Sequence, residues 1–170
     1  MDDPVEETVG LGADHYKAIG QVAISWSFME LIIDAQTWKY AELDETLGAC
    51  LTAQIAGSGR KLDALFALIR CRFKPSDKLE GRFNKFSEAT TGLAERRNRV
   101  IHDPWIKFAK DDKSRRIQIT AKKRLVFDTV EHPTQDIFKL GKDIHRHADA
   151  FKAIMEAADL ELAAWREKNP

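Results

Sequence analysis

Residues 77–105 read DKLEGRFNKFSEATTGLAERRNRVIHDPW, and the structure expected on either side depends on this stretch. One set of side chains recurs along it every three or four residues: Leu79, Phe83, Phe86, Thr90, Leu93, Arg97 and Val100. This spacing predicts a long helix with one buried stripe, and Arg97 stands within that stripe. The segment His102-Asp103-Pro104 ends the helix, because proline disfavours helical geometry in the residue before it.

The hydrophobic period changes after Pro104. Three short segments are partly alternating and rich in β-branched or aromatic residues, and polar turns separate them: 105–108, 116–120 and 125–130. Such segments predict a small antiparallel meander, inserted at about residues 105–131. Beyond it, apolar residues keep helical spacing from Thr134 to the end of the chain, which predicts a long final helix.

Upstream, residues 14–43 have the pattern of a long helix with two apolar stripes. One stripe consists of Ile19, Val22, Trp26, Met29 and Ile33, and the other of Ile24, Phe28, Leu31, Ala35 and Trp38. A helix with two apolar faces is either central in its domain or shared with a partner. Two further helices are expected, one capped by Asp44 or Thr46 and one capped by Ser58.

These patterns predict a mainly α fold. It is a helical bundle of about five helices, with the small antiparallel β-meander inserted before the long C-terminal helix. Residues 13–170 are expected to form a single domain, and residues 1–12 a flexible acidic N-terminus.

Composition excludes several classes of protein. No uninterrupted apolar run approaches the ~20 residues of a membrane span, and the acidic N-terminus lacks the apolar core of a secretory signal. Cys50 and Cys71 have no disulfide or zinc-ligand pattern and are expected to be small buried hydrophobes. We therefore expect a cytoplasmic protein with no membrane contact, no metal and no cofactor.

The net charge of zero over 170 residues conceals an asymmetry. Residues 1–50 hold 2 basic and 10 acidic side chains, whereas residues 96–124 hold 11 basic and 3 acidic ones. A neutral total therefore does not exclude an RNA or nucleotide partner. Any such binding is expected to be local to residues 96–124 and to weaken with salt.

The end of the central helix carries the residues that suggest chemistry. Asn98 and His102 are four residues apart and share a helix face, and Arg97 adjoins them. Metal-free RNA cleavage needs a base for the ribose 2′-hydroxyl and an acid for the departing 5′-oxygen, and histidine suits both roles. A guanidinium matches the oxygens of the phosphate. We therefore expect His102 as general acid/base, Arg97 as phosphate clamp and Asn98 as the residue that orients His102.

The pattern Arg97-Asn98-x-x-x-His102 resembles the R-x(4–6)-H motif of the HEPN superfamily, in which Asn, Asp or His typically follows the arginine. Residues 26–30, WSFME, strengthen a resemblance to bacterial HEPN-like proteins without assigned function. The resemblance implies a helical bundle that acts as a homodimer, either as a metal-independent endoribonuclease or as an RNA- or nucleotide-binding module. The meander directly after the motif departs from the helical core of that family.

Further basic residues extend the candidate nucleic-acid-binding set on both sides of the motif. They are Arg96, Arg99, Arg115, Arg116, Lys122, Lys123 and Arg124. Solvated turns often have this composition, but such residues also follow a phosphate backbone.

Other interpretations compete with the nuclease hypothesis. Arg and His are common at helix C-termini for electrostatic reasons alone. Arg97 is then a structural ion-pair partner of Glu30 or Asp34, and the chain is a non-catalytic helical dimerisation or protein-interaction module. A further interpretation is that the chain is a regulatory subunit, which binds another protein through the second stripe of the first helix. His145 and His147 lie two residues apart, so they are expected on different faces and in solvent.

Overall fold

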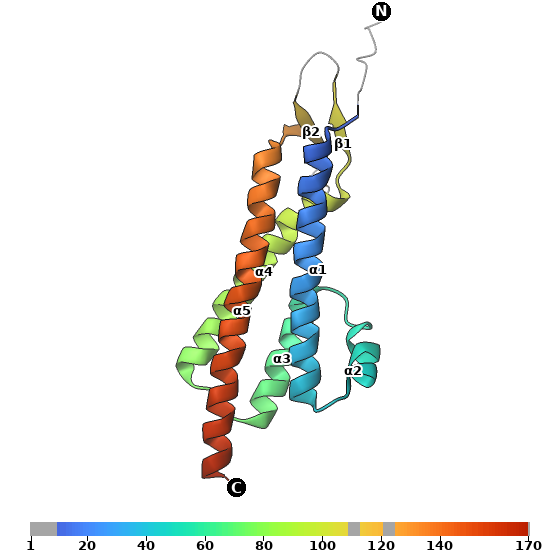
Figure 1. Ribbon diagram of the computed structural model, residues 1–170. Coiled ribbons are helices and arrows are strands. Elements are labelled where there is room, and N and C mark those ends of the chain that lie inside the picture. Colours follow the sequence, from blue (N-terminus) through green and yellow to red (C-terminus); the bar gives the residue numbers. More distant parts are fainter. Residues whose placement is uncertain (1–9, 109–112, 121–124, 170) are drawn as a thin grey trace, which may run out of the picture. The chain divides into compact units, whose positions relative to one another are not determined.

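The computed structural model describes residues 10–108, 113–120 and 125–169. It contains the helices and strands α1 (Ala13–Ala41), α2 (Glu45–Thr52), α3 (Ser58–Arg72), α4 (Asp77–His102), β1 (Trp105–Lys107), β2 (Ser114–Thr120), β3 (Val126–Glu131) and α5 (Thr134–Lys168). The mainly α fold and the three-stranded meander before the last helix are confirmed (Figure 1). The expected loose N-terminus lies mostly outside the described residues.

The chain forms two compact units. Unit 1 comprises the start of the chain up to Ser25 together with Glu95–Asp143, and unit 2 comprises Trp26–Ala94 together with the chain from Ile144 onward. Helices α1, α4 and α5 each contribute residues to both units. Unit 1 therefore holds the whole meander and the motif at the end of α4, whereas α2 and α3 belong to unit 2.

Unit 2 is built on side chains that recur at helical spacing. Buried residues come from all its long segments: Trp26, Met29, Ile33, Leu62, Leu65, Phe66, Ile69, Leu79, Phe83, Phe86, Ile144, Phe151 and Met155. The ring centroids of Phe66 and Phe83 lie 3.9 Å apart, and those of Phe86 and Phe151 lie 5.1 Å apart. The expected stripes of α4 and α5 thus supply this core, because helical spacing keeps each stripe on one side.

Helix α2 is held to α1 by a close approach of its backbone. The Asp44 carboxylate accepts hydrogen bonds from two amides of the first turn, which fixes the start of α2. A Cβ atom on Gly48 would lie 2.4 Å from Cγ of Trp38, so only glycine fits there. The Trp38 indole also donates to the Thr52 hydroxyl at 3.0 Å. Figure 1 shows α2 beside the C-terminal part of α1.

The sheet of unit 1 has the strand order β1-β2-β3, with both pairs antiparallel. Trp105 lies opposite Arg116, and Arg116 lies opposite Val130. The Trp105 indole donates to the backbone carbonyl of Val100 at 2.9 Å, so it satisfies an acceptor left open at the end of α4. This contact anchors the first strand of the sheet directly to the helix that precedes it.

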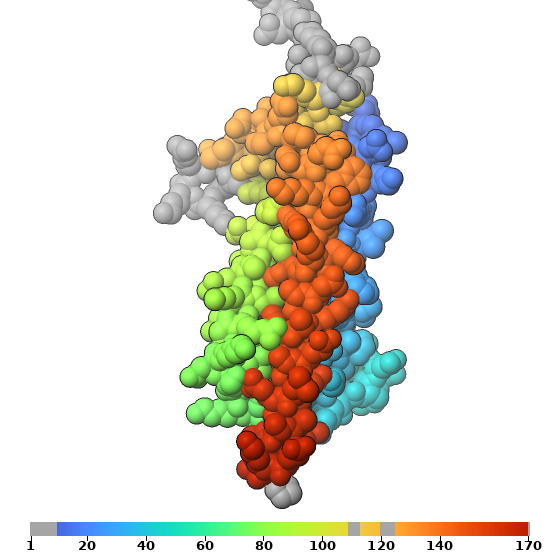
Figure 2. Space-filling view, turned by 60° about the vertical axis from the view of Figure 1, so that its left-hand side comes forward, coloured from blue at the N-terminus to red at the C-terminus, as the bar shows by residue number. Residues whose placement is uncertain are grey.

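The second apolar stripe of α1 is largely exposed. Ile24 is 73% exposed, Leu31 54% and Phe28 43%. In unit 2, α2 adds two more exposed apolar residues, Leu47 and Leu51. Figure 2 shows α2 on the surface of the molecule, in cyan. The second stripe of α1 is therefore not enclosed in the way that its first stripe is.

Helix α1 is also the most apolar of the long helices. An 18-residue window within it has a mean hydropathy of 1.3, so by length and composition alone the helix could cross a membrane. Of that window, 28% is buried in the structure. The core helix of a folded domain passes the same test, and the buried stripe that includes Val22 and Met29 belongs to such a core.

Two expectations about individual side chains were wrong. Cys50 and Cys71 are both exposed, because each lies on the outer side of its helix. His147 is not in solvent: its ring stacks on Phe86 at 3.9 Å between centroids, and Nε2 lies 2.8 Å from the Thr90 hydroxyl. A polar residue that enters the apolar stripe of α4, Thr90, provides the partner that makes this burial tolerable.

We expect Phe151→Ala to lower the free energy of unfolding by about 3–5 kcal/mol, because the substitution empties a fully buried site. Urea denaturation measures the change. Phe127→Ala is the matched control, since that ring is 67% exposed, and it should change stability by less than about 0.5 kcal/mol. Equal effects of the two substitutions would contradict the core described above.

Burial lowers the pKa of His147 from 6.5 to about 4. Between these values the unfolded chain binds a proton that the folded chain does not, so the contribution of His147 to stability is present above pH 6.5 and decreases as the pH falls toward 4. Because the ring is only half-buried, we expect the decrease to be about 1–2 kcal/mol, less than the full shift implies. Thermal melts from pH 7.5 to 4.5 should show a smaller decrease in His147→Gln than in the wild type.

Candidate functional site

The three motif residues converge at the C-terminal end of α4. Nη1 of Arg97 donates a hydrogen bond to Oδ1 of Asn98 at 3.0 Å and lies 3.2 Å from Nε2 of His102. Asn98 and His102 are exposed, and Arg97 is half-buried. The helical spacing seen in the sequence therefore brings a guanidinium, an amide and an imidazole together at the surface.

The contact between Arg97 and His102 has a chemical consequence. A guanidinium carries only donors, so Nε2 of His102 must act as the acceptor, which places the imidazole proton on Nδ1. In this arrangement Nε2, a nitrogen that can accept a proton, lies beside the Arg97 guanidinium.

A surface groove of about 330 Å³ adjoins the motif. Its lining residues are Glu95, Asn98, Arg99, His102 and Asp103. All of them come from the last two turns of α4 and the residue that follows, so the groove is formed locally by the helix end. A single-stranded RNA or a small anion could reach His102 and Asn98 through this groove.

The other candidate basic residues differ in accessibility. Arg96 lies 3.7 Å from the Asp143 carboxylate, with 54% of its side chain exposed. Arg99 is half-buried and contacts Asp103 at 3.5 Å. Arg115 is half-buried, and its guanidinium lies 5.3 Å from the centroid of the Phe108 ring. Lys122, Lys123 and Arg124 lie outside the described residues.

Arg116 has a different environment from the expected solvated turn. It is only 8% exposed, and its Nη1 donates to Oδ2 of Asp103 at 2.6 Å. The same carboxylate oxygen is the partner of Arg99. One carboxylate thus ties the end of α4 to strand β2, and Arg116 is part of the interior of unit 1.

The expected structural partners of Arg97 lie on α1. Asp34 forms an ion pair with Lys61 of α3 at 2.7 Å, with both side chains mostly buried. Lys61 thus provides Asp34 with a cation inside unit 2. Glu30 is half-buried on the same helix.

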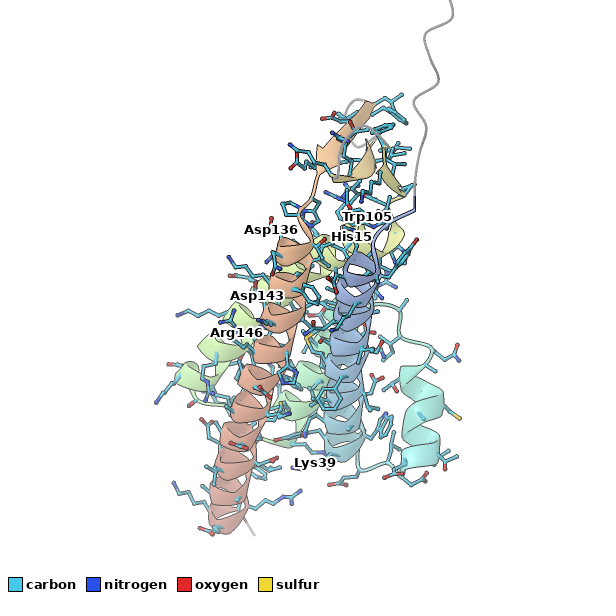
Figure 3. All side chains as sticks on the ribbon, turned by 45° about the horizontal axis from the view of Figure 1, so that its top comes forward. His15, Lys39, Trp105, Asp136, Asp143 and Arg146 are labelled. Carbon is cyan, nitrogen blue, oxygen red and sulfur yellow. The ribbon has the colours of Figure 1, made fainter. Side chains whose placement is uncertain are left out.

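Sequence reasoning assigned no role to His15 and His132, which flank Trp105. The His15 ring meets the Trp105 ring edge-on at 4.5 Å, and the His132 ring stacks on it at 5.8 Å. His15 is 2% exposed, and its Nδ1 lies 3.0 Å from the Thr134 hydroxyl. Burial lowers the pKa of both histidines, with further contributions from neighbouring positive charge. Figure 3 shows His15 beside Trp105. The three rings come from distant segments, so no local pattern could reveal them.

Metal ligands were not expected, and the described residues contain no group of three or more His, Cys, Asp or Glu side chains that could hold a metal ion.

We expect Asp103→Asn to lower stability by about 3–5 kcal/mol, because it leaves the Arg116 guanidinium buried without its carboxylate. Differential scanning calorimetry would record a fall of many degrees in Tm. Asp63→Asn, an exposed site on α3, makes the same chemical change and should leave Tm nearly unchanged. An equally small effect at Asp103 would show that the ion pair does not stabilise unit 1.

Comparisons of this chain with protein-family models, with curated proteins and with solved structures found no match.

Proposed function

We propose that this chain is a HEPN-like protein whose Arg97–Asn98–His102 site cleaves single-stranded RNA without a metal ion. The observation that carries the proposal is the contact of Arg97 with Asn98 and His102, two residues that line an exposed groove. A cation for the phosphate and an imidazole for proton transfer lie within hydrogen-bond distance of each other, and both are needed for this reaction.

In the proposed reaction, a bound phosphodiester takes over the donors of Arg97. His102 then accepts the proton of the ribose 2′-hydroxyl, and the 2′-oxygen attacks phosphorus. The bond from phosphorus to the 5′-oxygen breaks, and the products are a 2′,3′-cyclic phosphate and a 5′-hydroxyl. The leaving oxygen takes its proton from a protonated imidazole or from water, and Asn98 orients His102.

The proposal includes a homodimer. Each chain contributes one motif histidine, and a dimer provides two, so that one can act as the acid and the other as the base. The exposed apolar side chains of α1 and α2 in unit 2 support self-association, since residues such as Phe28, Leu31, Leu47 and Leu51 lie in water in a single chain. Sedimentation velocity of the wild type measures the oligomeric state.

We expect the purified protein to cleave single-stranded RNA in the presence of EDTA, and His102→Ala to reduce the rate at least about a hundredfold, as loss of a general acid/base does. Gel electrophoresis of a labelled oligonucleotide measures the cleavage, and the 2′,3′-cyclic phosphate identifies the chemistry. His145→Ala is the matched control, because that histidine is exposed on α5 and outside the motif. It should retain the wild-type rate.

Arg97→Ala separates the proposal from the structural interpretation of this arginine. If Arg97 clamps phosphate, the variant loses cleavage while its Tm stays close to that of the wild type. If Arg97 is a structural ion-pair partner, its removal lowers Tm by several degrees. Cleavage that persists unchanged in His102→Ala would overturn the assignment of the site.

A further inference from the structure

Unit 1 contains a second cavity, of about 280 Å³, bounded by the last turns of α4, strand β2 and the first turns of α5. Its lining residues are Arg96, Arg99, Val100, Arg116, His132, Asp136, Lys139 and Leu140. Four of these side chains are cationic and one is a carboxylate. The volume lies close to the lower limit of ordinary small-molecule sites, about 300 Å³.

Arg116 is the reason to expect a ligand here. Its side chain is nine-tenths buried, and among the described residues its Nε–H has no hydrogen-bond partner. The Asp103 carboxylate oxygen that pairs with its Nη1 also serves Arg99. Two guanidinium groups thus share one carboxylate, although a buried guanidinium with open donors is costly. An anion in the cavity would complete the set of partners.

The remaining charges surround the same cavity. Lys139 is exposed on α5, and Arg96 faces Asp143 at a distance of 3.7 Å. Asp136 is the only acidic residue of the lining. Figure 3 shows Asp136 and Asp143 along the first turns of α5. The cations thus come from three elements, α4, β2 and α5, and could approach one ligand from several directions.

We infer that this cavity binds a phosphoryl group. A phosphoryl group offers three oxygens, which suits donors that converge from three elements, whereas a carboxylate offers two oxygens in one plane. The cavity is larger than the anion itself, and Val100 and Leu140 provide apolar surface for the part of the ligand that carries the phosphate. The molecule that carries the phosphoryl group is either a small phosphate ester or a single-stranded RNA, which would bind through its backbone.

This site is distinct from the Arg97–Asn98–His102 site, and the inference goes beyond the proposed function. Arg99 lines both the cavity and the groove beside His102, so the two sites adjoin. The cavity, however, depends on Arg116, Lys139 and His132, none of which belongs to the motif. It would bind a phosphoryl group even if the motif cleaved nothing, and His102→Ala should leave that binding unchanged.

Nuclear magnetic resonance of the full chain tests the inference. The ¹⁵N-labelled protein is titrated with inorganic phosphate, ribose 5-phosphate, a short single-stranded RNA and acetate, at constant ionic strength. We expect saturable shifts at the cavity residues with the phosphate-bearing probes and none with acetate. Whichever of ribose 5-phosphate and RNA has the lower dissociation constant identifies the carrier.

The His132 ring gives an independent readout. Burial lowers the pKa of His132, and the positive charge of Arg116 and Arg96 lowers it further, whereas Asp136 opposes them. Its ring also stacks on Trp105 of β1, and His15 of α1 interacts with it electrostatically. A bound anion reverses the effect of the arginines, so saturating phosphate should raise the pKa of His132, whereas chloride at equal ionic strength should not.

Substitutions at exposed positions localise the binding, since Arg116 variants would also lose the ion pair with Asp103. Lys139→Ala should weaken phosphate binding about five- to tenfold, the loss of one charge-assisted contact. Lys142→Ala removes an exposed lysine from the next turn of α5, outside the lining, and should change binding less than twofold. Asp136→Asn should strengthen binding.

Three results would overturn the inference. One is the absence of saturable shifts with every phosphate-bearing probe. Another is an equal response to acetate, which would make the cavity a general anion site without preference for phosphate. The third is equal weakening by Lys139→Ala and Lys142→Ala, which would reflect the overall positive charge of the region instead of the cavity.

Discussion

The Asp103 carboxylate is the contact on which the arrangement of unit 1 depends. It lies at the point where Pro104 prevents α4 from continuing, and it accepts from Arg99 of that helix and from Arg116 of β2. The chain can therefore leave the helix and return as a sheet while the two elements remain bonded. Trp105 follows at once, and its indole closes the open carbonyl of Val100. The end of α4, which carries the motif, is thus held in place by its contacts with Arg116 and Trp105.

The regular parts of the fold follow from spacing, and could be predicted. Stripes such as Leu79, Phe83 and Phe86 bury because three- and four-residue steps return to one side of a helix. The strand at β2 was predicted, but the side of the sheet on which its side chains are buried could not be predicted in the same way. Alternation alone would turn Ile117 and Ile119 inward and Arg116 outward, yet Ile119 is 52% exposed and Arg116 is buried. The partner that reverses the pattern, Asp103, lies in the turn after α4, outside the strand itself.

The residues of unit 1 discussed as candidate sites also differ in how far the sequence could predict their contacts. Arg97, Asn98 and His102 lie within five residues of one another on one helix. Their contact could therefore be inferred from the sequence. The rings of His15, Trp105 and His132 come from α1, β1 and the segment before α5, and only the fold brings them together. His147 shows the same effect within unit 2. Its spacing from His145 gave no indication of the Phe86 ring or the Thr90 hydroxyl that accommodate it.

The sheet of unit 1 has a further consequence for the behaviour of the protein in concentrated solution. Strand β3 forms one edge of the three-stranded sheet and exposes Phe127 to water. An apolar edge of this kind is a template for pairing with a strand of another molecule. Asp128 places an exposed carboxylate on the same short strand, whereas Glu131 is paired with Lys113 at 2.8 Å, so identical strands brought edge to edge would repel each other through Asp128. A negative charge at this position is thus expected to oppose pairing of β3 with the same strand of a second molecule.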